Sequence, residues 1–343
     1  MPDQTPPGPE PSPWRNVRDG LLIVAVVVVL FVVLGEALVR VLNRDGHIHD
    51  LEVFKYARTL RIDPPRDAPE LHHMQRPGAR AVLQGVTVQI NSRGLRDVEH
   101  AAGPAKGVTR IVVLGDSVTF GWGVAMEDTY PRVLERRLNE TSAPARYEVI
   151  NAGVVDYPLS RIVAFYRREL ASLRPAIVVV GFSLNLANEA PERSVPSILD
   201  TPLQLPVFLH SRFENVAARF GRTGSFDRFY QDLYAESNPG FGSFAKRLTR
   251  FIGDLKARQQ SVVVASIPDV VHLEEPAYRF REIDRRVCEL ASRAGALTAD
   301  LYPSVKGIPA PKIVNSAEDR HPNALGHRLM GEHLARFIQS SGL

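Results

Sequence analysis

The strongest constraint on the fold is a regular alternation of short apolar runs and helical patterns that begins near residue 108. The spacing of apolar residues predicts helices between the runs, with Ser160 capping one of them, Ser243 preceding another, and Phe280, Ile283, Val287 and Leu290 on one face of a third. Buried strands that alternate with amphipathic helices are typical of a parallel sheet covered on both faces. We therefore expect an α/β fold, a three-layer α/β/α sandwich with a mostly parallel five-stranded sheet. The five predicted strands are 110–114, 147–150, 176–180, 261–267 and 296–299.

The first predicted strand ends abruptly in Gly115-Asp116-Ser117. Because ligands of open parallel sheets collect at the carboxyl ends of the strands, the Ser117 hydroxyl should face a crevice. A serine becomes a strong nucleophile only with a base in hydrogen-bond reach and donors for the oxyanion. Taken alone, this fragment is more typical of a polar turn, in which Asp116 serves as a structural cap.

A possible base lies near the other end of the chain, where Asp319-Arg320-His321-Pro322 precedes a predicted helix. Pro322 suits the first turn of that helix. A carboxylate beside a histidine orients the imidazole and stabilises its cationic form, as a general base requires. A solvated charged turn explains this fragment equally well when it is taken alone. We expect His327, which follows on the same helix, to be structural.

Together these two motifs resemble the SGNH/GDSL hydrolase family, in its membrane-anchored bacterial form. Three further matches follow predicted strands in the family's order. They are Thr119–Gly123 in the first block, Asn151-Ala152-Gly153 in the second and Gly181–Asn185 in the third. The resemblance covers roughly residues 108–343 and implies a flavodoxin-like sandwich that hydrolyses esters without a cofactor.

The resemblance also implies a role for each matching residue. Ser117 would be the nucleophile, His321 the general base and Asp319 the acid that orients it. The oxyanion hole would consist of the backbone N–H groups of Ser117 and Gly153 and the side-chain amide of Asn185.

Two positions depart from the family pattern. Leu186 follows Asn185 where the family usually has aspartate, which leaves Asn188 as an alternative amide. The family's acid often lies three residues before the histidine, and here that residue is Glu318 rather than Asp319. We predict Asp319 as the acid, because membrane-attached relatives often have Asp-x-His-Pro-Asn.

Three functions are compatible with these residues. The leading hypothesis is a serine esterase that hydrolyses acyl esters, including O-acetyl esters, of a cell-envelope glycan or lipid. The second is an O-acyltransferase that uses the same triad to acylate a polysaccharide. The third is a non-catalytic glycan-binding module, which only the Leu186 departure favours.

A second feature is the uninterrupted apolar run at 21–34, whose apolar character continues to Leu42. A membrane-spanning helix needs roughly 20 mainly apolar residues, so 21–42 is predicted to cross a membrane once. Glu36 and Arg40, one turn apart, would pair or reach the interface. Arg15 and Arg18 precede the run and favour a cytoplasmic tail, which places the catalytic domain outside the cytoplasm. The alternative is a signal peptide cleaved near Gly35-Glu36-Ala37.

The remaining segments are less constrained. We predict a disordered tail at 1–20, because it is rich in proline, and a connecting segment at 43–107 with a hairpin over 82–90 and a turn at 91–94. Residues 188–242 are expected to form a cap or a substrate loop.

Composition excludes several classes of function. The net charge is only +4 and the basic residues are dispersed, so a nucleic-acid partner is not expected. The chain contains no P-loop, dinucleotide fingerprint or Gly-x-Ser-x-Gly elbow. The single cysteine, Cys288, is interpreted as a small buried apolar residue. We interpret two histidine-containing stretches as solvated loops rather than metal sites, namely His47–Asp50 and His72-His73.

Overall fold

A five-stranded sheet of order β6-β5-β7-β8-β9 forms the centre of the molecule, and all four strand pairings are parallel. The computed structural model describes residues 13–140, 146–189, 201–220, 226–271, 273 and 278–343. The observed sheet confirms the predicted fold class and all five predicted strands. The strands are β5 (Thr109–Gly115), β6 (Tyr147–Gly153), β7 (Ile177–Phe182), β8 (Ser261–Ser266) and β9 (Leu297–Asp300).

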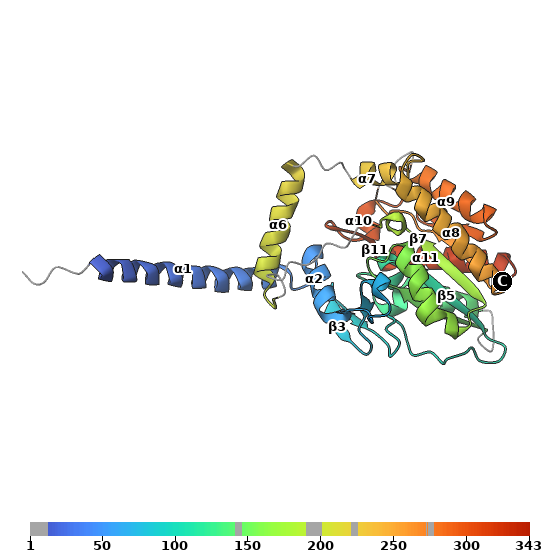
Figure 1. Cartoon of the computed structure of the whole chain (residues 1–343), viewed down its shortest axis with the longest axis horizontal. Helices are drawn as coiled ribbons and strands as arrows, with labels where there is room; N and C mark the ends of the chain where they lie inside the picture. Colours follow the sequence, from blue (N-terminus) through green and yellow to red (C-terminus); the bar gives the residue numbers. More distant parts are fainter. Residues whose placement is uncertain (1–12, 141–145, 190–200, 221–225, 272, 274–277) are drawn as a thin grey trace, which may run out of the picture.

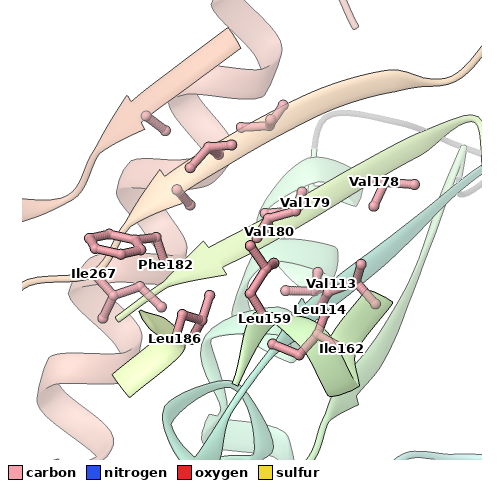
Figure 2. Close-up of a cluster of buried hydrophobic side chains, with 14 of the residues drawn as sticks. Val113, Leu114, Leu159, Ile162, Val178, Val179, Val180, Phe182, Leu186 and Ile267 are labelled. Atoms are coloured by element: carbon pink, nitrogen blue, oxygen red, sulfur yellow. The ribbon is translucent and has the colours of Figure 1, made fainter. Parts of the chain in front are cut away.

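Helices cover both faces of the sheet, as expected for a three-layer sandwich. In one layer α4 packs against α11, and in the other α8 packs against α5 and α9 (Figure 1). The central strands β5 and β7 are therefore buried on both faces, and Figure 2 shows valine and leucine side chains filling the space between sheet and helices. The helices are α4 (Tyr130–Asn139), α5 (Leu159–Phe165), α8 (Pro239–Ala257), α9 (Arg281–Arg293) and α11 (Ala324–Ser340).

The beginnings of three helices differ from the sequence-based expectation. Helix α11 begins at Ala324 with Asn323 as its cap, so Pro322 lies before the helix and not in its first turn. Helix α5 begins at Leu159, so Ser160 lies in its first turn and is not its cap. Helix α8 begins at Pro239, four residues before Ser243, because the Asn238 side chain accepts the N–H of Gly240 at 2.8 Å. Proline at the first helical position and asparagine at the cap are strong start signals that the apolar spacing alone does not reveal.

Short elements surround the carboxyl ends of the strands. Helix α3 (Ser117–Phe120) follows β5 directly, and α10 (Ala310–Ile313) precedes the two-stranded pair β10 (Val314–Ser316) and β11 (Asp319–Pro322). The predicted hairpin is confirmed as β3 (Arg80–Leu83) and β4 (Val86–Gln89). A further small pair is formed by β1 (Arg61–Ile62) and β2 (Met74–Gln75).

The segment 43–107 packs onto the sandwich rather than extending as a linker. It contains α2 (His49–Leu60) and both hairpin strands. Five of its buried residues share one apolar cluster with Phe120 and Trp122, which follow Ser117 in the chain. The members from the segment are Tyr56, Leu60, Leu83, Val88 and Ile90.

At the N-terminal end, α1 (Pro13–Leu42) extends away from the sandwich (Figure 1). Its residues Val17–Leu42 are apolar and long enough to cross a membrane, and most of their side chains are exposed. Residues 13–20, predicted to belong to a disordered tail, are the first turns of this helix, whereas 1–12 lie outside the described residues.

The predicted cap region contains two further helices. Helix α6 (Gln204–Phe220) crosses α1 near its C-terminal end (Figure 1), and α7 (Phe226–Leu233) follows it. The stretches 190–200 and 221–225 lie outside the described residues. Two smaller predictions were wrong, since Cys288 is only half-buried and His73 is buried against Tyr157 rather than solvated.

Candidate active site

The turn between β5 and α3 presents Ser117 at the carboxyl edge of the sheet. Asp116 caps α3, because its carboxylate accepts the Val118 N–H at 3.0 Å and the Ser183 hydroxyl at 2.6 Å. A Cβ on Gly115 would lie 2.0 Å from Thr119 Oγ1, so only glycine permits this tight approach. The structure thus supports the structural interpretation of Asp116.

His321 and Asp319 meet Ser117 although 204 positions separate the serine from the histidine. Ser117 Oγ lies 2.7 Å from His321 Nε2, and His321 Nδ1 lies 2.6 Å from Asp319 Oδ1. The backbone N–H of His321 also donates to Asp319 Oδ1 at 3.0 Å, which fixes the carboxylate under the ring. Each contact is a hydrogen bond of ordinary length, so the three side chains form one continuous chain.

The carboxylate of Asp319 is buried and surrounded by donors. Its Oδ2 accepts the Gln84 side-chain amide at 2.5 Å and the Asn315 amide at 3.3 Å, and His49 Nδ1 lies 3.7 Å from Oδ1. Burial raises the pKa of the Asp319 carboxyl, but the hydrogen bond from His321 and the nearby His49 ring outweigh it and hold that pKa well below its usual range. Asp319 is therefore charged at neutral pH.

The alternative acid, Glu318, takes no part in this chain. It is exposed and pairs with Arg212 at 3.2 Å, because the side chains of adjacent residues in β11 and the preceding turn point in different directions. Of the two carboxylates, the structure brings only Asp319 to the histidine.

Asn185 lines a pocket of about 330 Å³ together with His321. The asparagine lies in the short 3-10 helix Leu184–Ala187 that follows β7, and its Oδ1 accepts the Tyr230 hydroxyl. Since Tyr230 occupies the amide oxygen, the amide nitrogen of Asn185 is the group left to donate into the pocket. Asn188, the alternative, is absent from the described pocket lining.

A family model described as GDSL-like Lipase/Acylhydrolase family matches residues 113–329, more than half of the chain. The chain belongs to this family. No curated protein matches it.

Solved structures of similar fold include three esterases or lipolytic proteins. A protein of the G-D-S-L family from Desulfitobacterium hafniense DCB-2 is 16% identical, with a TM-score of 0.43 over 66% of this chain and 98% of that one. Axe2, an acetyl xylan esterase from Geobacillus stearothermophilus, is 13% identical, with a TM-score of 0.46 over 67% and 94%. A two-domain esterase, CEX, active on acetylated mannans, is 18% identical, with a TM-score of 0.43 over 68% and 49%.

Within this GDSL-like esterase, the leucine that departs from the family pattern fills the core. Leu186 is fully buried and lies beside Phe182 and Ile267 in the apolar cluster of Figure 2. An aspartate here would need polar partners that this surrounding lacks. The departure therefore changes the packing under Asn185 and leaves the asparagine itself at the pocket.

Gly153 does not have the expected geometry of an oxyanion donor. Its backbone N–H donates to the Asn151 side chain at 3.0 Å, and its carbonyl accepts the Gln75 amide at 2.9 Å. A Cβ at this position would lie 2.1 Å from the Phe120 backbone nitrogen. The glycine allows β6 to approach α3 closely, so the match in sequence reflects packing beneath the nucleophile rather than a free donor.

Arg96 is a supporting residue whose role the sequence left open. Its buried guanidinium donates to three backbone carbonyls after α3, those of Phe120 at 3.1 Å, of Gly121, and of Val124 at 2.5 Å. Burial lowers the pKa of Arg96 to about 10, so the side chain stays charged at neutral pH. It fixes the loop that follows Ser117, and the predicted turn at 91–94 places it there.

His49 is a second histidine at the site, and the prediction of a solvated loop is wrong for it. It begins α2, stacks on His321 with ring centroids 5.8 Å apart, and packs edge-on against Trp122. The possible ligand atoms of His49, Asp319 and His321 lie within 4.8 Å of one another. Among the described residues, these three form the group that could hold a metal ion. An ion there would compete with the hydrogen bond between His321 and Asp319.

Two predicted elements lay next to these supporting residues, the turn at 91–94 before Arg96 and the hairpin over 82–90. The hairpin that carries Gln84 was predicted, but nothing in its pattern indicated that its turn reaches Asp319. His327, as predicted, is structural: it is fully buried, and its Nδ1 accepts the N–H of Tyr130 at the start of α4.

Proposed function

We propose that this GDSL-like esterase hydrolyses acyl esters through an acyl-enzyme formed on Ser117. The observation that carries the proposal is the continuous chain from Ser117 Oγ to His321 Nε2, at 2.7 Å, and from His321 Nδ1 to Asp319, at 2.6 Å. A serine so paired is activated for attack, because its proton has an acceptor already in place.

In the proposed reaction His321 Nε2 takes the proton of Ser117 as Oγ bonds to the ester carbonyl carbon. The tetrahedral intermediate collapses, the bond to the alcohol oxygen breaks, and His321 returns the proton to the leaving alcohol. Water then enters and gives a proton to His321 as its oxygen bonds to the acyl carbon. The bond from that carbon to Ser117 Oγ breaks, His321 returns the proton to Oγ, and the acid leaves. Asp319 stabilises the imidazolium that forms in both halves of the reaction.

Two donors would stabilise the oxyanion in this proposal. One is the backbone N–H of Ser117 at the start of α3, and the other is the side-chain amide of Asn185. The hydrogen bond from Tyr230 to the Asn185 oxygen orients the amide nitrogen toward the pocket. Such preorganised donors act without reorganisation when charge develops on the oxygen.

The pocket favours small acyl groups. Its volume of about 330 Å³ is at the lower end of the range for ligand pockets, and it is lined by polar groups such as Asp269 and Arg320 as well as Asn185. We propose an acetyl or similarly short ester carried by a cell-envelope glycan or lipid. The basic residues Arg15 and Arg18 in the first turns of α1, before its apolar run, support a single-pass topology with the sandwich outside the cytoplasm.

The test uses the full chain in detergent micelles. The protein is mixed rapidly with p-nitrophenyl acetate, quenched in acid, and digested for mass spectrometry. We expect a burst of p-nitrophenol and an acetyl group on Ser117. Ser160→Ala, a serine in α5 away from the triad, is the matched control and should keep both signals. Turnover without acetyl on Ser117 in the burst phase would contradict the proposal.

A further inference from the structure

Helix α6 is attached to the end of the apolar helix α1. The Glu36 carboxylate of α1 accepts the N–H groups of Gln204 at 3.1 Å and Leu205 at 2.8 Å, so it caps α6 from another helix. Arg40 binds the same carboxylate at 2.6 Å and the carbonyl of Pro202 at 3.2 Å. The two charges inside the apolar segment therefore pair, as the sequence predicted, and also hold the start of α6.

Close packing adds to this attachment. A Cβ on Gly35 would lie 2.9 Å from Leu205 Cδ2, so the leucine of α6 rests directly on the glycine of α1. Glu36 is 9% exposed and Val39 is buried in a small apolar cluster shared by α1, α2 and α6. One side of the last two turns of α1, at Gly35, Glu36 and Val39, is thus covered by protein, whereas Leu38, Val41 and Leu42 and the turns before Gly35 are exposed.

The attachment lies where the hydrocarbon core of a membrane would end. Gly35 and Arg40 follow Leu21, the first residue of the apolar run, by 14 and 19 positions. At 1.5 Å per residue they lie about 21 and 29 Å along the helix axis. The hydrocarbon core is about 30 Å thick, so Arg40, which holds the carbonyl before α6, lies at the boundary between lipid and water, and the contact at Gly35 lies one to two turns inside it.

The direction of α6 fits this boundary. Figure 1 shows α6 roughly perpendicular to α1, so a membrane crossed by α1 would lie parallel to α6. One face of α6 packs on the domain, since Val207 is buried beside α2 and the Ser211 hydroxyl donates to Asp50. Leu209 and Phe213, one turn apart on the opposite face, are 47% and 69% exposed.

We propose that α6 is an interfacial helix, which rests on the surface of the bilayer that α1 crosses and inserts Leu209 and Phe213 among the lipids. A lipid surface explains why large apolar side chains stand exposed on a helix fixed beside an apolar span. The inference rests on the position of α1 and α6 and is independent of the reaction proposed above.

This arrangement fixes the height of the pocket above the membrane. Arg212 of α6 pairs with Glu318 at 3.2 Å, and Glu318 lines the pocket beside His321. The rim of the pocket therefore lies next to the helix that is proposed to contact lipid. An ester carried at the membrane surface would then be close to the entrance of the pocket.

The test measures the depth of α6 in the full chain reconstituted into phosphatidylcholine vesicles. Cys288 is first replaced by serine, and a nitroxide is attached to Phe213→Cys. The matched control carries the label at Lys246→Cys, an exposed position on α8. Collision with oxygen reports lipid exposure and collision with a nickel chelate reports water exposure. Far-ultraviolet circular dichroism and thermal unfolding check that each variant folds, so that the test does not depend on esterase activity.

We expect a severalfold higher ratio of oxygen to nickel accessibility at position 213 than at position 246. Equal ratios at the two positions would overturn the proposal, since Phe213 would then face water. Low accessibility to both reagents with spin–spin broadening would also overturn it, because a second copy of the chain would then cover this face. In a separate sample, Phe213→Glu should make α6 more susceptible to limited proteolysis in vesicles, because the charged side chain would not enter the lipid. In detergent the substitution should not change the susceptibility of α6.

Discussion

The two sides of the pocket are built differently. On the side of the base, Ser117, His321 and Asp319 form a closed chain of hydrogen bonds, and Gln84 and Asn315 satisfy the remaining oxygen of the acid. On the oxyanion side, the Asn185 side chain is exposed and is held by one hydrogen bond from Tyr230. The difference indicates that the groups proposed to transfer the proton are held in place by the protein alone, whereas the proposed oxyanion donor has room for a further hydrogen bond to substrate. Substitutions on the first side should therefore cost more than substitutions on the second.

The largest effect is expected from removal of the nucleophile or the base. Ser117→Ala and His321→Ala should each lower kcat for p-nitrophenyl acetate by about 10⁴-fold or more, because neither attack nor proton transfer can proceed. Steady-state assays with active-site titration measure this. The double variant should be no slower than either single one, since the residues act as a unit; multiplicative losses would contradict a shared role.

The second-largest loss of kcat is expected from substitution of the acid. Asp319→Asn keeps the shape but removes the charge that stabilises the imidazolium, and kcat should fall by about 10³–10⁴-fold. Glu318→Gln is the matched control, because Glu318 pairs with Arg212 rather than with the histidine, and it should change kcat less than about threefold. If Glu318→Gln were the more damaging of the two, the assignment of the acid would be wrong.

The three residues of the hydrogen-bonded chain were predictable from sequence, whereas the residues that support them, Gln84 and Arg96, were not. Ser117 follows a strand, and Asp319 and His321 precede a helix, but each local pattern is also typical of a polar turn. The resemblance to the family, rather than either pattern alone, predicted that the three side chains meet. The contacts of Gln84 and Arg96 depend on how the segment before β5 folds back over the sandwich. The sequence around Gln84 and Arg96 has no periodic pattern that predicts this packing.

The oxyanion side shows where a sequence match fails. Asn185 lies at the pocket as expected, but the N–H of Gly153 is already bonded to Asn151. The sequence contains the glycine because a Cβ would collide with the α3 backbone, and this requirement is visible only in three dimensions. In the same way, the alternation of strands and helices predicted the sheet. It did not predict the start of α8, which Asn238 and Pro239 determine.

A smaller loss is expected on the oxyanion side. Asn185→Ala should lower kcat by about 10²–10³-fold with little change in KM, because the donor acts mainly on the charged intermediate. Tyr230→Phe removes only the hydrogen bond that orients the amide, and it should cost about tenfold or less. A loss for Tyr230→Phe as large as that for Asn185→Ala would show that the tyrosine hydroxyl, rather than the amide, is the donor.

The smallest effect concerns His49 and appears in stability rather than in turnover. Burial lowers the pKa of His49, but its contact with Asp319 outweighs that and raises the pKa above the ordinary 6.5. Because the folded-state pKa is raised, protonated His49 stabilises the fold below about pH 6.5, and this contribution is lost as pH rises through the folded-state pKa. His49→Gln keeps a donor but cannot be protonated. The Tm of the unmodified chain should therefore exceed that of the variant by more at pH 5.5 than at pH 8, in thermal unfolding followed by circular dichroism. A Tm difference independent of pH would mean that the histidine contributes only packing against Trp122 and His321.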